Sequence, residues 1–197
     1  MFFTVYLKKL GRDRNLNLIS EVIYKENDVT WVSNTFFKAV DTLETKKNDP
    51  ENASVFYNRG NAKSKLQDYI GAIEDFTLSI ELNPKSDAYN NRGIAKARLN
   101  DHKGAEQDFT EAIDLDPTDP SSYNNRGGSR GALADFKGAL ADFTKTIELE
   151  PKDGSGYFGS GICKLKLGQK TSGCMDLTIA ERLGHPSANE AKRKYCN

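Results

Sequence analysis

Apolar side chains between residues 53 and 183 recur at helical spacing, in stripes that short polar stretches separate. Residues 86–99 carry one such stripe, which includes Ala88, Ala95 and Leu99, and residues 102–115 carry the next. Two stripes joined by a short turn predict a helix hairpin. The same pattern recurs along the chain and predicts four hairpins, at 53–66 with 69–82, 86–99 with 102–115, 120–133 with 136–149, and 154–167 with 170–183.

Landmark residues recur in each hairpin at a nearly constant step. An aromatic-x-x-Arg-Gly motif occurs as Phe56-x-x-Arg59-Gly60, Tyr89-x-x-Arg92-Gly93, Tyr123-x-x-Arg126-Gly127 and, with serine for arginine, Tyr157-x-x-Ser160-Gly161. Its glycines lie 33, 34 and 34 residues apart. Further along each copy stand Ala72-x3-Phe76, Ala105-x3-Phe109, Ala139-x3-Phe143 and the weaker Gly173-x3-Leu177, and the first three copies close with Pro84, Pro117 and Pro151.

A period of about 34 residues with these landmarks resembles the tetratricopeptide repeat (TPR). The resemblance covers roughly residues 50–186, in units of about 53–85, 86–119, 120–153 and a degenerate 154–186. It implies an all-α solenoid, in which antiparallel helix pairs stack into a right-handed superhelix. The last residues, from Lys194 to Asn197, together with the string that begins at Gly173, also resemble endings of bacterial TPR proteins of Bacteroidetes type.

The two ends of the array are expected to be capped. Residues 32–49 predict a partial N-terminal repeat helix, because Phe36-x-x-Ala39-Val40 reproduces the pattern that starts at Phe109. Residues 1–31 carry no repeat signature and are expected to form an irregular cap, with disorder as the alternative. Residues 187–197 predict an amphipathic capping helix, which would cover the apolar face of the last hairpin.

Small residues of the motif are expected to bring the paired helices together. We expect each unit glycine to face the alanine of the next helix where the two helices cross, as the pairs Gly60 and Ala72, Gly93 and Ala105, and Gly127 and Ala139.

The arginines of the motif have two readings. An aspartate stands on each second helix, at Asp75, Asp108 and Asp142, so a semi-buried Arg–Asp pair is the structural interpretation. In the alternative, the arginines line a groove for an acidic ligand.

Charge and composition narrow the functions. The 197 residues include 28 basic and 28 acidic side chains, and this balance argues against nucleic-acid or anionic-membrane binding. No stretch approaches 18 apolar residues, so no membrane insertion is expected. Lys8 and Lys9 interrupt the apolar start and no cleavage site follows, which predicts a cytoplasmic protein; a periplasmic or secreted protein is the alternative if the native N-terminus carries a signal.

The family resemblance implies that the first helices of the units form a concave surface that binds peptides. Asparagines recur on this surface. Their amides both donate and accept, which suits the backbone of an extended peptide. The predicted groove contacts are Tyr57, Asn58, Asn61, Asn90, Asn91, Arg98, Asn124 and Asn125. The alternative is that the Asn-Asn pairs are tolerated surface residues.

Some TPR domains hold the C-terminal carboxylate of heat-shock chaperones with two lysines, two asparagines and an arginine. Asn61 and Asn91 match the asparagines of that clamp, but Tyr57, Ser121 and Asn125 stand where its cations would be. Without those charge-assisted bonds, a chaperone-tail clamp is not expected.

Cysteines gather at the C-terminal end, at Cys163, Cys174 and Cys196. The capping helix should run back along the preceding helix, which brings Cys196 toward Cys174. A disulfide between these two residues and a reduced pair are both open, and a zinc site is improbable without a paired spacing motif.

No catalytic or cofactor motif stands out. His102 and His185 lie in turns, away from any recognisable nucleophile, and the glycine clusters after Gly127 lack the flanking strand and the Lys-Ser/Thr of a phosphate loop. We therefore predict a non-enzymatic protein or peptide-binding adaptor, or an assembly scaffold, without a cofactor. The alternative is a homo-oligomeric structural module that associates through its N-terminal segment or the solenoid end faces.

Overall fold

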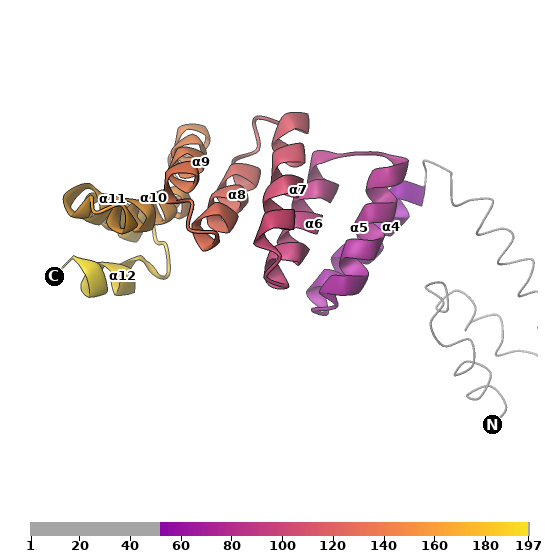
Figure 1. The fold of residues 1–197 in the computed structure, drawn as a ribbon, viewed down its shortest axis with the longest axis horizontal. Helices are drawn as coiled ribbons and strands as arrows, with labels where there is room; N and C mark the ends of the chain where they lie inside the picture. Colours follow the sequence, from indigo (N-terminus) through magenta and orange to yellow (C-terminus); the bar gives the residue numbers. More distant parts are fainter. Residues whose placement is uncertain (1–51, 197) are drawn as a thin grey trace, which may run out of the picture. The chain divides into compact units, whose positions relative to one another are not determined.

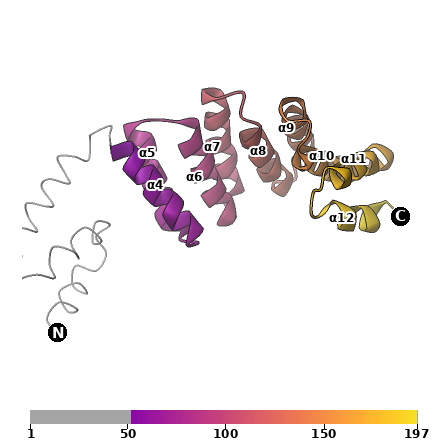
Figure 2. The same ribbon diagram turned by 180° about the vertical axis from the view of Figure 1, so that it is seen from behind.

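Residues 52–196 are described by a computed structural model, and within that range every regular element is an α-helix. The helices form consecutive antiparallel pairs followed by a short last helix (Figures 1 and 2). They are α4 (Asn52–Lys65), α5 (Tyr69–Leu82), α6 (Ser86–Arg98), α7 (His102–Leu115), α8 (Pro120–Ala132), α9 (Phe136–Leu149), α10 (Gly154–Lys166), α11 (Lys170–Arg182) and α12 (Ala188–Tyr195).

The predicted ends of the eight hairpin helices agree with these bounds to within one residue, and the capping helix predicted over 187–197 spans 188–195. The fold class predicted from the sequence, an all-α solenoid of helix pairs, is confirmed. The expected cap at 1–31 and the partial repeat helix at 32–49 lie outside the described residues. No helix between residues 52 and 196 has the length and apolar character needed to cross a membrane.

The second helices α5, α7 and α9 each begin at a capping aspartate. Asp68, Asp101 and Asp135 accept a hydrogen bond from the backbone N–H of the glycine three residues later, at 2.9 to 3.0 Å. The residue just before each cap has positive φ: Gln67 at 63° and Ala134 at 62° are examples. The turn between paired helices therefore requires the left-handed conformation, which the fourth unit supplies with a glycine.

The unit glycines of the first three units pack against a phenylalanine ring of the second helix, and the predicted facing of each glycine with an alanine stays a prediction. A methyl group added at Gly93 would lie 2.7 Å from the ring of Phe109, and one at Gly60 would lie 2.8 Å from Phe76. In the fourth unit, where a leucine replaces phenylalanine, Gly161 lies against Gly173 and Leu177.

The units stack so that first helices become neighbours. Helix α6 contacts α8, and α8 contacts α10, in addition to the contacts between consecutive helices. The core runs along the stack as the alanine and phenylalanine side chains of the second helices, with Phe76 and Phe109 almost fully buried. The first helices α6, α8 and α10 are thus placed to share one surface.

Candidate peptide-binding groove

A buried aspartate in each of the first three units binds two cations of the preceding helix. In the second unit, Arg92 donates from Nε and Nη2 to the carboxylate of Asp108 at 2.9 and 2.7 Å, and Lys96 Nζ lies 2.8 Å from the same group. Only 4% of the Asp108 side chain is exposed. This bidentate geometry confirms the structural interpretation of the Arg–Asp pairs.

The other units repeat this arrangement. Arg59 and Lys63 bind Asp75, and Arg126 and Arg130 bind Asp142. In the fourth unit a serine hydroxyl replaces the guanidinium: Ser160 donates to Asp176 at 2.7 Å and Lys164 Nζ lies 2.6 Å away. The second cation, always three residues after the unit glycine, is a recurring signal that the sequence reasoning missed.

The same arginines also link neighbouring units. Arg92 Nη1 donates to Thr77 of the preceding unit at 3.1 Å, and Arg126 Nη1 donates to Thr110 at 3.2 Å. Each guanidinium also lies over the aromatic ring three residues earlier; for Arg92 the ring is Tyr89, at 5.4 Å. The alternative that the motif arginines line a ligand groove is wrong, because their charges are held by buried carboxylates.

These contacts shift the titration of Asp75. Burial by itself would raise the pKa of this carboxyl group, but hydrogen bonds from Arg59 and Lys63, with the charges of both, outweigh burial and lower the pKa. Asp75 therefore stays ionised, and its role is to hold α4 against α5.

A hollow of about 750 Å³ opens between the first helices α6, α8 and α10. Its apolar lining includes Ile94, Phe136, Phe158 and Ile162. The hollow also reaches the backbone of α8, where added methyl groups at Gly128 and Gly131 would meet no atom within 4 Å. We call this hollow the α6–α8–α10 groove.

Asparagine amides connect successive first helices beside this groove. Asn125 Nδ2 donates to Asn90 Oδ1 of the preceding unit at 3.0 Å. One unit earlier, Asn91 Nδ2 donates to Tyr57 Oη at 3.1 Å and to Asn61 Oδ1 at 2.9 Å. The amides thus form a ladder along the stack, and Gly159 stands where the next asparagine would be.

The predicted contact residues separate into three sets. Arg98, Asn124 and Asn125 line the groove, and Asn90 touches it through Asn125. The cluster of Tyr57, Asn61 and Asn91 lies one unit toward the N-terminus. Asn58 is exposed on α4 and is in neither set.

Both histidines of the chain line the groove, which the sequence reasoning did not anticipate. His185, in the connection from α11 to α12, stacks on Phe158 with ring centroids 4.1 Å apart. Burial lowers the pKa of His185, against a smaller opposing effect of Asp153. The buried Nδ1 atoms of His185 and His102 make no hydrogen bond to the described residues. His185 therefore joins the C-terminal connection to the wall of the groove as a mostly neutral aromatic ring.

The C-terminal helix α12 packs on α11 and is tied to it. A disulfide joins Cys174 to Cys196, and Glu181 accepts bonds from Asn189 and Lys192. Cys163 is a free, buried thiol, and burial raises its pKa to about 11. Among residues 52–196, no three histidine, cysteine or acidic side chains are arranged to hold a metal ion.

Comparison with protein families matches two tetratricopeptide repeats, at residues 53–86 and 86–119. Among solved structures, the chain is similar to the Arabidopsis OM64 TPR domain, with 31% identity over 59% of this chain and 97% of that one and a TM-score of 0.58. It is also similar to the first TPR of Spaghetti (RPAP3) bound to the HSP90 peptide SRMEEVD, with 28% identity over 61% and 96% of the two chains and a TM-score of 0.60.

A third similar structure is matched over a larger share of the chain. MamA shares 21% identity over 88% of this chain and 100% of that one, with a TM-score of 0.66. At this level of identity, the similarity supports the fold and not a function. Comparison with curated proteins gives no significant match.

Proposed function

Because the chain belongs to the tetratricopeptide repeat family, we propose that it is a non-enzymatic adaptor or assembly scaffold. In this proposal, the α6–α8–α10 groove binds an extended peptide segment of a partner protein. The observation that carries this proposal is the groove itself. Three successive units contribute to one open, largely apolar surface, and asparagine amides stand along it. The peptide held by the similar Spaghetti structure supports peptide binding at the general level.

The amides of the groove have hydrogen-bonding capacity left for a ligand. Asn124 makes no side-chain hydrogen bond within residues 52–196. Asn125 donates one N–H to Asn90, which leaves its oxygen available as an acceptor. A peptide backbone offers alternating N–H and C=O groups and is a suitable partner for both.

We test this function with peptides selected from a random library on the immobilised full chain and measured by fluorescence polarisation. Replacing Asn124 and Asn125 together with alanine should weaken the selected peptides about tenfold or more, because a hydrogen bond is typically worth about 1 kcal/mol. The matched control is Gln107→Ala, which removes an exposed amide from α7, outside the groove lining. Equal affinity of the double variant and the control would place binding elsewhere.

A second candidate is self-association through the C-terminal end of the stack. Met175 on α11 is 62% exposed, and it borders a second hollow of about 630 Å³ that also reaches the disulfide. An apolar side chain at the end of an array is where another copy would stack. Light scattering of the wild type and of Met175→Lys should then show a loss of mass in the variant; a monomer at all concentrations would exclude this candidate.

A further inference from the structure

We propose, resting on the proposed function, that the α6–α8–α10 groove selects an internal peptide segment in which a bulky apolar side chain is flanked by carboxylates. The apolar side chain fills a notch over Gly128, and the carboxylates meet Arg98 and Lys166. Two observations carry this inference: a row of apolar side chains has a gap, and two cations form no ion pair with a residue in 52–196.

The gap follows from the register of the three first helices. Ile94, Gly128 and Ile162 each come directly after the glycine of their unit, so they occupy equivalent positions on α6, α8 and α10. All three line the groove. An apolar side chain is therefore missing from the middle of the row.

No side chain of the described protein fills that gap. An added methyl at Gly128 would meet no atom within 4 Å, and the same holds for Gly131, three residues later on the same helix. The glycines elsewhere in the first helices differ, since Gly93 and Gly127 lie tight against a phenylalanine ring. Gly128 weakens its helix without an internal packing contact to explain it, and it leaves space for a ligand side chain.

The charge of the groove lining is positive. Its cations are Arg98 on α6 and Lys166 on α10, and none of the described residues that line it is an aspartate or a glutamate. Both stand five residues after the glycine of their unit, which places them at equivalent positions. Neither forms an ion pair with a residue in 52–196, whereas Lys96, Arg130 and Lys164 are all paired.

Acidic groups near the groove are already in use or face other partners. Glu106 is bonded to Arg130, Asp135 caps α9, and Asp153 caps α10. Among residues 52–196, Arg98 and Lys166 are therefore the groove-lining charges that form no ion pair. Charge complementarity favours an acidic segment, and the separation of the cations on two helices favours carboxylates on side chains over a single chain terminus.

The test uses fluorescein-labelled, C-terminally amidated peptides and the full chain, measured by fluorescence polarisation. The acidic probe is Ser-Glu-Asp-Glu-Leu-Phe-Glu-Asp-Ser. One comparison peptide replaces every acid with its amide, a second replaces Leu-Phe with Ser-Ser, and a third leaves the acidic probe with a free carboxyl terminus. The acidic probe should bind about tenfold more tightly than the first two and as tightly as the third.

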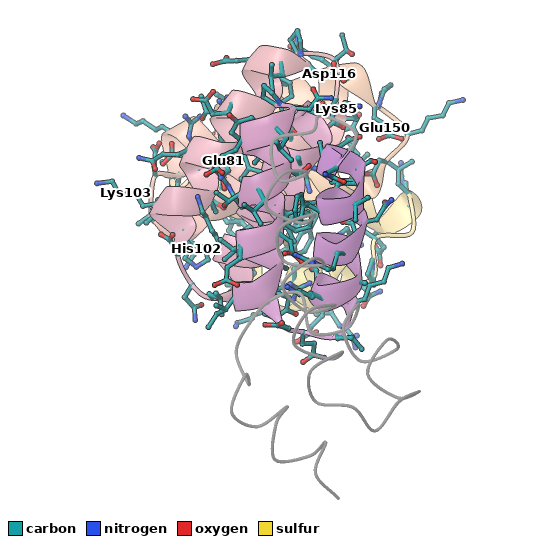
Figure 3. The ribbon with its side chains drawn as sticks, turned by 90° about the vertical axis from the view of Figure 1, so that its right-hand side faces the viewer. Glu81, Lys85, His102, Lys103, Asp116 and Glu150 are labelled. Atoms are coloured by element: carbon teal, nitrogen blue, oxygen red, sulfur yellow. A yellow bond between two sulfur atoms is a disulfide. The ribbon has the colours of Figure 1, made fainter. Side chains whose placement is uncertain are left out.

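Variants separate charge from shape. The double variant Arg98→Gln, Lys166→Gln should bind the acidic probe about tenfold more weakly and the amide peptide with unchanged affinity. It should also reduce the salt dependence of binding of the acidic probe. Gly128→Leu should weaken the acidic probe about tenfold and yet raise the thermal stability of the chain, which damage to the fold would not do. The matched control is Lys103→Gln, because Lys103 is an exposed cation that points away from the helices (Figure 3).

The outcomes distinguish this inference from the proposed function. Equal binding of the acidic and amide peptides, still weakened by the Asn124→Ala, Asn125→Ala double variant, overturns the inference and leaves groove binding intact. A gain of tenfold with the free carboxyl terminus also overturns it. If library-selected peptides bind but the acidic probe does not, the inference fails; if no library peptide binds, the proposed function fails with it.

Discussion

Asp108→Asn tests how much the buried aspartates hold the stack together. The substitution keeps the size of the side chain but removes the charge that Arg92 and Lys96 share. The single amide oxygen cannot accept the two parallel bonds of Arg92, and the amide N–H groups face cations. The variant therefore leaves two positive charges without their buried partner.

The magnitude follows from the burial of the three groups. Breaking a buried ion pair by removing one partner costs about 3 to 5 kcal/mol. The arginine and lysine side chains are still 16% and 20% exposed, so water recovers part of that cost and we take the lower end, about 3 kcal/mol. For a chain of this size the melting temperature should fall by about 6 to 12 °C.

The assay is urea and thermal unfolding followed by far-UV circular dichroism. Asp114→Asn is the matched control, because it removes an exposed carboxylate from the same helix and should change stability by less than about 0.5 kcal/mol. A double-mutant cycle with Arg92→Gln should give a coupling energy of about 2 kcal/mol. If Asp108→Asn is as stable as the control, or the coupling is close to zero, the ion pairs do not stabilise the units as argued.

Four other changes test the glycines, the buried carboxylate of Asp75 and the disulfide. Gly93→Ala should lower the stability by about 1 to 3 kcal/mol, because the added methyl meets a phenylalanine ring at 2.7 Å. Gly128→Ala should raise the stability by about 0.5 to 1 kcal/mol, because its methyl meets no atom within 4 Å. Melting temperatures that shift in the same direction in both variants would contradict this prediction. The pKa of Asp75 in the folded chain lies below its ordinary value of 3.8, so the stabilising effect of its charge is complete above pH 3.8 and is lost as the pH falls through the lowered pKa. Asp75→Asn should therefore reduce the loss of stability at acid pH, measured by urea unfolding as a function of pH. An unchanged pH profile would contradict this prediction. The Cys174–Cys196 disulfide spans a sequence separation of 22 residues, and its reduction should lower the stability of the capping helix by about 3 kcal/mol. Hydrogen exchange of α12 with and without reductant measures this loss. The Cys196→Ser variant, which should not respond to reductant, is the control.

The sequence predicts the helices well because local signals mark them. The helical spacing of apolar residues and the recurring glycines and prolines place each helix to within one residue. The Arg92–Asp108 pair is predictable too, since burial of one charge requires the other. These features depend on contacts inside one hairpin, whose geometry the repeat period specifies.

Features that depend on how hairpins stack are harder to predict. The sequence reasoning missed the contact of Arg92 with Thr77, because this contact crosses between units. It also missed the stack of His185 on Phe158, which a residue outside the repeat motif provides. The empty place at Gly128 appears only when neighbouring first helices are aligned, since in isolation this glycine reads as a weak point in a helix.

Arg92 and Arg126 each reach back to a threonine of the unit before it. Every repeat of the 86–119 type therefore carries both halves of its own junction: an arginine for the preceding neighbour and a threonine for the following one. A duplicated copy of that segment inserted after itself would find matching partners on both sides. Gene duplication could thus lengthen the array by whole units, adding further contact positions for a longer ligand while leaving the existing ones unchanged.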